Sequence, residues 1–571
     1  MMQWSRWFPF LQWPRPDLQT ARGEIVAGLT VSMLVIPQSM AYAALAGMPL
    51  ITGVYAAFLP ALVALLWSAS PRLSVGPTAL TSLLVMASVS GLAPPASAEW
   101  VTLVVWLSLL SGIFQCLFGL ARFAWILNLV SAPVLTGFTQ AAALLIIGAQ
   151  LHTLMGLQGT WHWSLGLANV NAPSAAFGLG TLAFLILGKH WAPKAPTLMV
   201  AIVATGAISV ASNFAASGGA VVGALPSGFP GFYWPTLPPL QTLGALVLPA
   251  MVVALVSFLE TAASAKVDNQ RAGKLWDGDQ DLIAQGLAKI ASGFVGSFPT
   301  SSSFARSAIN LYAGAKTGWA TLVSILAVMV VLLWLTPALY HIPSAALAGV
   351  VIAAIIGLVK PWELVRLWRV FPVEAITMAV TFAVTLLTAP QIYWGILAGV
   401  MLGLIGFLHQ RLHPRIVEVG LHPDGSLRDR HLWQLPSLAP NLYALRIDAA
   451  LDFAAASSFE QNLFSYLLVH PETRHVCLFA HPINRIDATG VEKFSSIYNL
   501  LFSRGITLHL SGLKFPVEAA LRRAGLLSGS PYLKVYRSDS EALAQLSRLS
   551  SASSTTPATM PVRVTAKDGG L

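Results

Sequence analysis

The stretch FPTSSS, from Phe298 to Ser303, leads into an unusually short apolar segment that carries the cation Arg306. A stretch of the same kind, SVGPTA from Ser74 to Ala79, leads into another short apolar segment at residues 78–91. Proline near a helix start and Ser or Thr at its cap are typical signals of a helix N-terminus. The sequence therefore predicts two short helices that begin inside apolar parts of the chain.

The composition indicates the surrounding medium. Charged residues are 10% of the chain and hydrophobic residues 56%, whereas soluble domains are about 25% charged. We therefore expect an α-helical polytopic membrane protein that lies largely in the lipid bilayer. The two cysteines, Cys116 and Cys477, suggest neither a disulfide framework nor a metal site, so no metal and no cofactor are expected.

Fourteen apolar segments lie between Ile25 and His409, most of them near the 17 to 25 residues that a membrane helix needs. The two short segments are the third and the tenth, which makes them equivalents in a 7+7 inverted repeat. Paired broken helices at matching positions are the best sequence indication of a transporter site. Their N-termini would attract an anion, with Arg306 adding a full charge. The alternative is two proline-kinked helices in a packed bundle.

Charge placement predicts the topology. With a cytoplasmic N-terminus, Lys and Arg gather in the even-numbered connections and are absent from the odd ones, as the positive-inside rule requires. This pattern holds only if residues 123–155 cross once, as a re-entrant or kinked element. Lys289 would snorkel from the cytoplasmic start of its helix. The net charge of +10 would face anionic lipid, and no nucleic-acid partner is expected.

Glu260 is the only acid in the apolar stretch 243–265. A charge at the bilayer centre costs about 2.5 to 3.5 kcal/mol on insertion scales, so Glu260 and Arg306 are both interpreted as functional. Glu260 could carry a proton, because burial and a nearby cation act in opposite directions on a carboxyl group. The alternatives are an interfacial acid that reaches toward Lys266, and a purely structural pair between Arg306 and Glu260.

Several motifs resemble the SulP anion transporters, also called solute carrier family 26. They are Ile36 to Ala43 (IPQSMAYA), Gly53 to Phe58 (GVYAAF), Leu73 to Thr78 (LSVGPT), Gly137 to Thr139 (GFT), and Gly296 to Ala308 (GSFPTSSSFARSA). The resemblance runs from about Asp17 to Leu546. It implies fourteen helices, a core domain of segments one to four and eight to eleven, a gate domain of the rest, a homodimer, and a C-terminal cytoplasmic STAS domain.

The resemblance also implies a substrate site between segments one, three, eight and ten. The residues carried over are Gln38, Tyr42, Thr78, Ala79, Ser303, Phe304, Ala305 and Arg306, with Glu260 at the coupling position. Gln38 and Tyr42 are four residues apart and share a helix face, where they could instead serve helix packing. Thr78 and Ser303 could merely cap their helices.

Alternating strand and helix patterns after Leu442 predict a small α/β domain with one sheet. Asp487, Ala488 and Thr489 resemble the STAS signature loop. Ala488 stands where related proteins carry a phosphorylated Ser, which argues against a phospho-switch. A cytoplasmic partner could bind there. The expected limits are a cytoplasmic segment 1–23, a transport domain 24–411, a linker 412–440, a STAS domain 441–548 and a disordered tail 549–571.

The combined hypothesis is proton-coupled sulfate uptake by alternating access, in a bacterial inner membrane with both termini cytoplasmic. A full charge and two helix dipoles suit a divalent oxyanion better than chloride. C4-dicarboxylates and bicarbonate, the latter with sodium, are alternative substrates. An anion channel or a STAS-linked anion sensor is the alternative of another class. An enzyme is not expected, because no catalytic spacing occurs outside the apolar segments.

Overall fold

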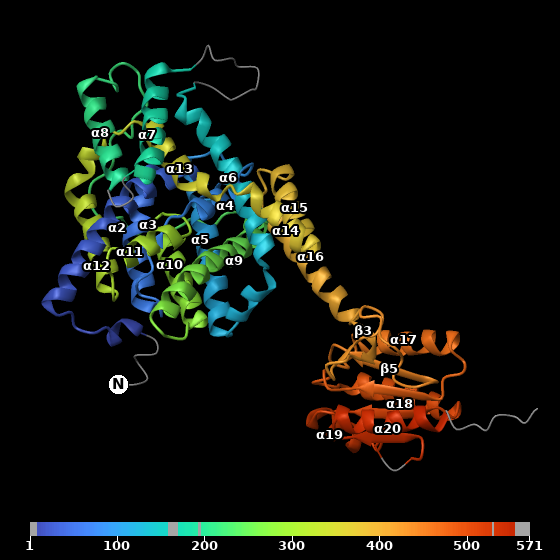
Figure 1. The fold of residues 1–571 in the computed structure, drawn as a ribbon. Coiled ribbons are helices and arrows are strands. Elements are labelled where there is room, and N and C mark those ends of the chain that lie inside the picture. Colours follow the sequence, from blue (N-terminus) through green and yellow to red (C-terminus); the bar gives the residue numbers. More distant parts are fainter. Residues whose placement is uncertain (1–7, 158–169, 192–195, 528–529, 554–571) are drawn as a thin grey trace, which may run out of the picture. The chain divides into compact units, whose positions relative to one another are not determined.

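The computed structural model describes residues 8–157, 170–191, 196–527 and 530–553 (Figure 1). The chain divides into two compact units between Leu404 and Ile405. The first unit is helical, and the second contains a six-stranded sheet.

The helices of the first unit follow the expected apolar segments. Its first seven long elements are α2 (Leu18–Leu45), α3 (Leu50–Trp67), α4 (Ala79–Val89), α5 (Ala98–Leu120), α6 (Ala132–Leu154), α7 (Ala172–Trp191) and α8 (Thr197–Ala211). The next are α9 (Leu240–Arg271), α10 (Gly278–Phe294), α11 (Phe304–Tyr312), α12 (Trp319–Val330), α13 (Ser344–Ile355), α14 (Pro361–Val370), α15 (Pro372–Leu387) and α16 (Tyr393–Leu412). Short helical turns are η1 (Pro9–Gln12), η2 (Ala124–Leu129), η4 (Val331–Leu335), η5 (Thr336–Leu339) and η6 (Ile356–Leu358).

Within the described ranges, nine helices are long and apolar enough to cross a membrane, and α4, α8 and α15 are shorter apolar helices. Each of the fourteen expected segments overlaps one of the helices above. That all fourteen cross the bilayer stays a prediction. Residues 123–155 contain one long helix, α6, preceded by the turn η2.

Small residues let the helices of this unit approach closely. A Cβ built on Gly53 of α3 would lie 1.9 Å from the Ser39 carbonyl oxygen of α2. A Cβ on Gly112 of α5 would lie 2.7 Å from the Gly286 carbonyl oxygen of α10. Such close backbone contact is typical of membrane helices, where dispersion contacts stabilise the packing. Glycine is therefore required at both crossings.

The second unit has one sheet with the strand order β4-β3-β5-β6-β7-β8. The strands are β3 (Ile416–Leu421), β4 (Leu427–Asp429), β5 (Leu442–Ile447), β6 (His475–Phe479), β7 (Thr507–Ser511) and β8 (Leu533–Tyr536). Strands β5 to β8 are parallel, and β3 and β4 add antiparallel pairs at one edge.

Helices cover both faces of this sheet. Apolar side chains of α17 (Ala456–Val469), α18 (Ala488–Ser503) and α19 (Phe515–Arg523) pack in one cluster with the strands. Side chains of α20 (Asp539–Ser553) pack in a second cluster, with Cys477 and Phe479 of β6. Burial of both faces explains the nearly continuous apolar strands.

Three parts of this unit differ from the expectation. The range 412–440, expected as a linker, contains β3 and β4. Strand β8 and helix α20 were not expected at all. Residues 549–553 of the expected disordered tail belong to α20, and the rest of the tail lies outside the described residues.

Candidate functional site

The short helices α4 and α11 start side by side. The strand β1 (Val75–Gly76), just before α4, pairs antiparallel with β2 (Ser301–Ser302), just before α11. The Ser303 N–H also donates to the Ser74 carbonyl oxygen at 3.0 Å. The Ser74 N–H donates to the Ser307 hydroxyl at 3.0 Å. The expected convergence of the two helix N-termini is therefore present in the fold.

Arg306 lies in the first turn of α11 and is only 1% exposed. Its Nε donates to the Ser74 hydroxyl at 3.3 Å, and its Nη1 donates to the Pro77 carbonyl oxygen at 2.9 Å. Its Nη2 is buried and has no hydrogen-bond partner in the described part of the chain. A buried donor without a partner is costly, so Nη2 is a ready contact for an anion.

Glu260 lies on α9 beside the same helix start. The Thr78 hydroxyl donates to Glu260 Oε2 at 3.0 Å. Thr78 is also the N-cap of α4, and its hydroxyl accepts the Thr81 N–H at 3.4 Å. Thr78 is thus a cap and a partner of the carboxylate at once. The capping role is present, the bond to Glu260 was not expected, and a contact of Thr78 with the substrate stays a prediction.

Among the described residues, neither of the ion pairs considered for Glu260 is formed. The Lys266 ammonium lies 5.6 Å from the centre of the Trp276 ring. Arg306 and Glu260 interact electrostatically, but the described side chains form no ion pair within 4.0 Å between them. A Glu260 that reaches toward Lys266 is therefore not the observed arrangement.

The other candidate residues differ in burial. Tyr42 is 6% exposed and interacts electrostatically with Arg306 and Glu260, whereas Gln38, one turn earlier on α2, is half-buried. Ala79 and Ser303 are half-buried at the helix starts, where Ser303 caps α11. Phe304 is 56% exposed and Ala305 is also exposed. The first turn of α11 thus has one buried side, with Arg306, and one exposed side.

The location of the Lys289 side chain differs from the expectation. It was expected to snorkel from a helix end, but it is 0% exposed and lies deep within α10. Its ammonium donates to Gln115 Oε1 of α5 at 2.9 Å. Sequence position gives depth along a helix, but not which neighbour the side chain faces. Lys289 is therefore, with Arg306, a second buried basic residue, and its ammonium interacts electrostatically with Glu260.

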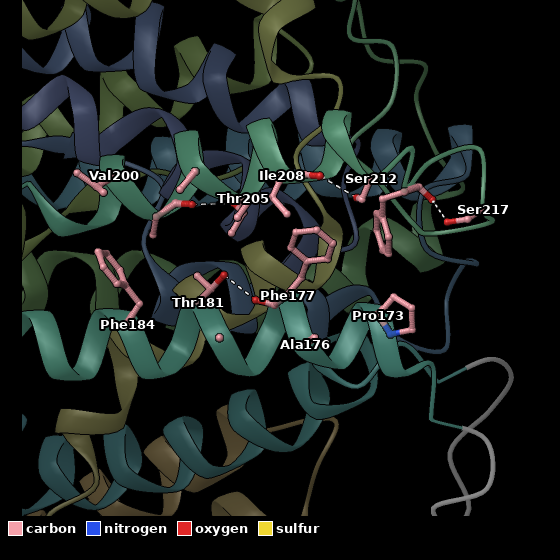
Figure 2. Close-up of a pocket in the computed structure, with 14 residues that line it drawn as sticks. Pro173, Ala176, Phe177, Thr181, Phe184, Val200, Thr205, Ile208, Ser212 and Ser217 are labelled. Carbon is pink, nitrogen blue, oxygen red and sulfur yellow. Dashed lines mark hydrogen bonds between the residues drawn. The ribbon is translucent and has the colours of Figure 1, made fainter.

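The larger cavities of this unit lie elsewhere. One of about 570 Å³ lies between α7 and α8 (Figure 2). Its hydroxyls donate within their own helices: Thr181 to the Phe177 carbonyl and Thr205 to the Ala201 carbonyl (Figure 2). Ser212 and Ser217, which also line it, donate to the Ile208 and Phe214 carbonyl oxygens, and the other lining side chains are apolar. A cavity without a free donor or a cation does not suit an anion.

The STAS-like loop serves as a helix cap. Asp487 accepts the Gly490 N–H at 2.8 Å and the Phe453 N–H at 2.9 Å, so it caps α18 and ties two loops together. Ala488 and Thr489 are exposed in the first turn of α18. Within the described ranges, no cluster of His, Cys, Asp or Glu could hold a metal ion.

These features define a helical membrane transporter with a C-terminal α/β domain, and comparisons with known proteins identify its family. The model of the sulfate permease family matches residues 22–381, and the STAS domain model matches residues 438–542. A probable sulfate transporter of Mycobacterium tuberculosis is 31% identical over 518 residues, which cover 89% of this chain and 92% of the relative. The chain belongs to the sulfate permease family, SulP or solute carrier family 26, and carries a STAS domain.

Other relatives agree with this assignment. The chloroplastic sulfate transporter 4.1 of Arabidopsis thaliana is 30% identical, covering 91% of this chain and 79% of the relative. The murine solute carrier 26 family member A9 has a similar fold, with a TM-score of 0.85, 20% identity, and 95% and 94% of the two chains covered. The transmembrane domain of the cyanobacterial bicarbonate transporter BicA has a TM-score of 0.57 at 20% identity, covering 68% and 98%.

Proposed function

We propose that this protein is a proton-coupled anion transporter that takes up sulfate by alternating access. The observation that carries the proposal is the buried Nη2 of Arg306, which has no hydrogen-bond partner among the described residues and lies beside two converging helix N-termini. N–H groups and the positive ends of helix dipoles favour negative charge. A tetrahedral oxyanion offers several acceptors to such a set of donors. Relatives named as sulfate transporters support this choice of substrate.

Glu260 is the proposed proton carrier. Its carboxyl oxygen accepts from the Thr78 hydroxyl at the start of α4, so it shares a helix start with the proposed anion site. When Glu260 is protonated, Arg306 acts on the anion without competition from a neighbouring carboxylate. After release of the anion, an ionised Glu260 would interact with Arg306 and favour return of the empty protein. The core helices α2 to α5 and α9 to α12 would move against the remaining helices.

The anion and the coupling ion each have an alternative. Fumarate or another C4-dicarboxylate carries the same charge as sulfate, and bicarbonate with sodium is a third candidate; the bicarbonate transporter BicA shares the fold. An anion channel or a STAS-linked sensor would not need a titratable acid beside the anion site. The proposed setting is a homodimer in a bacterial inner membrane, with both termini cytoplasmic.

The test is uptake of labelled sulfate into proteoliposomes with and without an inward proton gradient. Fumarate and bicarbonate serve as competitors, and a sodium gradient replaces the proton gradient in a parallel series. We expect sulfate to accumulate only with the proton gradient, and fumarate to compete more weakly than sulfate. Uptake that is independent of the proton gradient would contradict the role of Glu260 as a proton carrier. Accumulation driven by sodium alone would favour the bicarbonate-type alternative.

A further inference from the structure

Lys289 is a buried cation without an acidic partner. Its ammonium donates a hydrogen bond to Gln115 Oε1, and among the described residues no carboxylate oxygen lies within 4.0 Å of it. Taking a charge out of water without a counter-charge is strongly unfavourable. Membrane proteins keep such charges where they serve a substrate or ion pathway.

Gln115 connects Lys289 to the turn of α9 that precedes Glu260. Its Nε2 donates to the Ala254 carbonyl oxygen at 2.7 Å and to the Ser257 hydroxyl at 2.9 Å. Ser257 is three residues before Glu260, and residues three apart are neighbours on a helix surface. The charge of Lys289 is therefore held next to the carboxylate side of the site.

A second contact leads from this turn to β2. The Ser301 hydroxyl donates to the Ser257 carbonyl oxygen at 3.0 Å. Ser301 pairs with Gly76 of β1, the strand that precedes α4. The same turn of α9 thus contacts both Gln115 and the strand pair that aligns the two short helices.

Among the described residues, two ionisable groups act on the charge of Lys289. Glu260 on α9 and Cys116 on α5 are its electrostatic partners. Arg306 is the other buried cation that interacts with Glu260. The formal charges around the site are thus two positive and one negative when Glu260 is ionised, and two positive when Glu260 is protonated.

We propose that Lys289 is a positioning residue that sets the preference for divalent over monovalent anions. It does not need to touch the anion, because electrostatic attraction acts over a distance in the protein interior. The energy of this attraction is twice as large for a divalent anion as for a monovalent one. Gln115 holds the ammonium in place. This inference rests on the proposed anion site, and it adds to that site the group that selects the anion by charge.

Three variants separate charge from structure. Lys289→Met removes the charge and keeps the length of the side chain. Gln115→Glu keeps the lysine and the size of the side chain at position 115, and it places a carboxylate next to the ammonium, so it neutralises the charge by pairing. It also removes the Nε2 donor to the Ala254 carbonyl oxygen and the Ser257 hydroxyl. Lys289→Arg retains the charge. The measured quantity is the ratio of the chloride to the sulfate inhibition constants against labelled sulfate uptake in proteoliposomes.

We expect the ratio to fall roughly tenfold in Lys289→Met and in Gln115→Glu, and to stay within about twofold in Lys289→Arg. If Lys289 has only a structural role, the outcome differs. Lys289→Met would weaken the binding of both anions equally, and Gln115→Glu would leave the ratio unchanged. An unchanged ratio in both neutralised variants overturns the inference. If Lys289→Met fails to fold, Gln115→Glu still decides.

The same ratio can be obtained without transport, from thermal stabilisation of the purified full-length protein by sulfate and by chloride. A wild-type protein that takes up no sulfate contradicts the proposed function, whereas the stabilisation ratio still tests Lys289. A wild-type protein that accumulates sulfate while the neutralised variants keep its anion preference contradicts the inference alone.

Discussion

Arg306→Lys separates the charge of Arg306 from its geometry. The guanidinium makes two hydrogen bonds that fix it, to the Ser74 hydroxyl and to the Pro77 carbonyl oxygen, and it leaves Nη2 unpartnered. Lysine has a single nitrogen on a flexible stem, so it cannot bond Pro77 and present a second donor in the same fixed plane. The positive charge remains, but the preorganised donor is removed.

The magnitude follows from the hydrogen bonds that the substitution removes. A hydrogen bond to a charged group contributes about 1.5 to 3 kcal/mol, so removal of the bond from Nη2 should weaken anion binding roughly 10- to 150-fold. Removal of the bond to Ser74 should lower stability by only about 1 kcal/mol, because at 3.3 Å this bond is longer than a usual N–H···O hydrogen bond. We therefore expect a large rise in KM for sulfate with a small fall in Tm.

The assay is saturation of sulfate uptake in proteoliposomes, with thermal unfolding of the same preparations in detergent. Arg72→Lys is the matched control. Arg72 forms an ion pair with the Asp268 carboxylate at 2.8 Å, so its charge is already compensated and it is not expected to bind the transported anion. It should leave the KM for sulfate within about twofold. A wild-type KM in Arg306→Lys would refute the assignment of Nη2 to the anion. An equal rise of KM in both variants would indicate a general loss of structure.

Three further outcomes are expected. Glu260→Gln keeps an acceptor for Thr78 but cannot release a proton, so proton-driven accumulation of sulfate should be lost while exchange of labelled for unlabelled sulfate remains. Glu363→Gln on α14 is the control. Accumulation by Glu260→Gln at the wild-type level would contradict proton coupling. Gly53→Ala places a Cβ 1.9 Å from the Ser39 carbonyl oxygen, so α2 and α3 must separate at a cost of about 1 to 3 kcal/mol, and Tm should fall. In the control Gly148→Ala the new Cβ meets nothing within 4 Å, so Tm should not fall. In the STAS domain, burial first, and then the charges of His475 and Lys534, lower the pKa of His509 to about 4 from 6.5. The unfolded domain therefore binds more protons, and stability that is complete above about pH 6.5 should be lost as the pH falls toward 4, by roughly 3 kcal/mol. Hydrogen exchange in β7, corrected for intrinsic rates, should show this loss in the wild type and much less of it in His509→Gln; parallel loss in both would exclude His509 as its source.

The parts of the site that sequence reasoning could find are those with a local signal. The helix starts at Ser74 to Ala79 and Phe298 to Ser303 carry proline and hydroxyl residues next to an apolar run, and this signal needs no partner. Glu260 stands alone in an apolar stretch, so composition alone singles it out.

Lys289 and the Nη2 of Arg306 carry no such signal. The burial of Lys289 depends on which face of α10 meets α5, and α10 begins at Gly278, earlier than its apolar part indicates. The free donor of Arg306 depends on where the Pro77 carbonyl lies in three dimensions.

The edge of the STAS sheet was missed for a related reason. Strand β3 has the sequence IVEVGL, which alternates in the way that strands do. The Pro, Gly and His residues that surround it are typical of a linker and concealed this pattern. Its place in the sheet is determined by its antiparallel pairing with β5, a partner that follows it in the chain. Strands of this kind depend on long-range pairing more than on local composition.

The formal charges of Glu260, Lys289 and Arg306, with Lys289 and Arg306 protonated, predict how coupling and substrate charge are linked. With Glu260 ionised, the formal charges of Glu260, Lys289 and Arg306 sum to +1, so a monovalent anion makes the occupied site neutral. With Glu260 protonated they sum to +2, and only a divalent anion makes it neutral. An uncompensated charge in a low-dielectric interior is costly, so the neutral combinations are the favoured transport forms. Sulfate should therefore move with a proton, whereas a monovalent anion that enters the same site should move without one. Uptake of labelled sulfate and labelled chloride under the same proton gradient tests this link, and equal stimulation of both would contradict it.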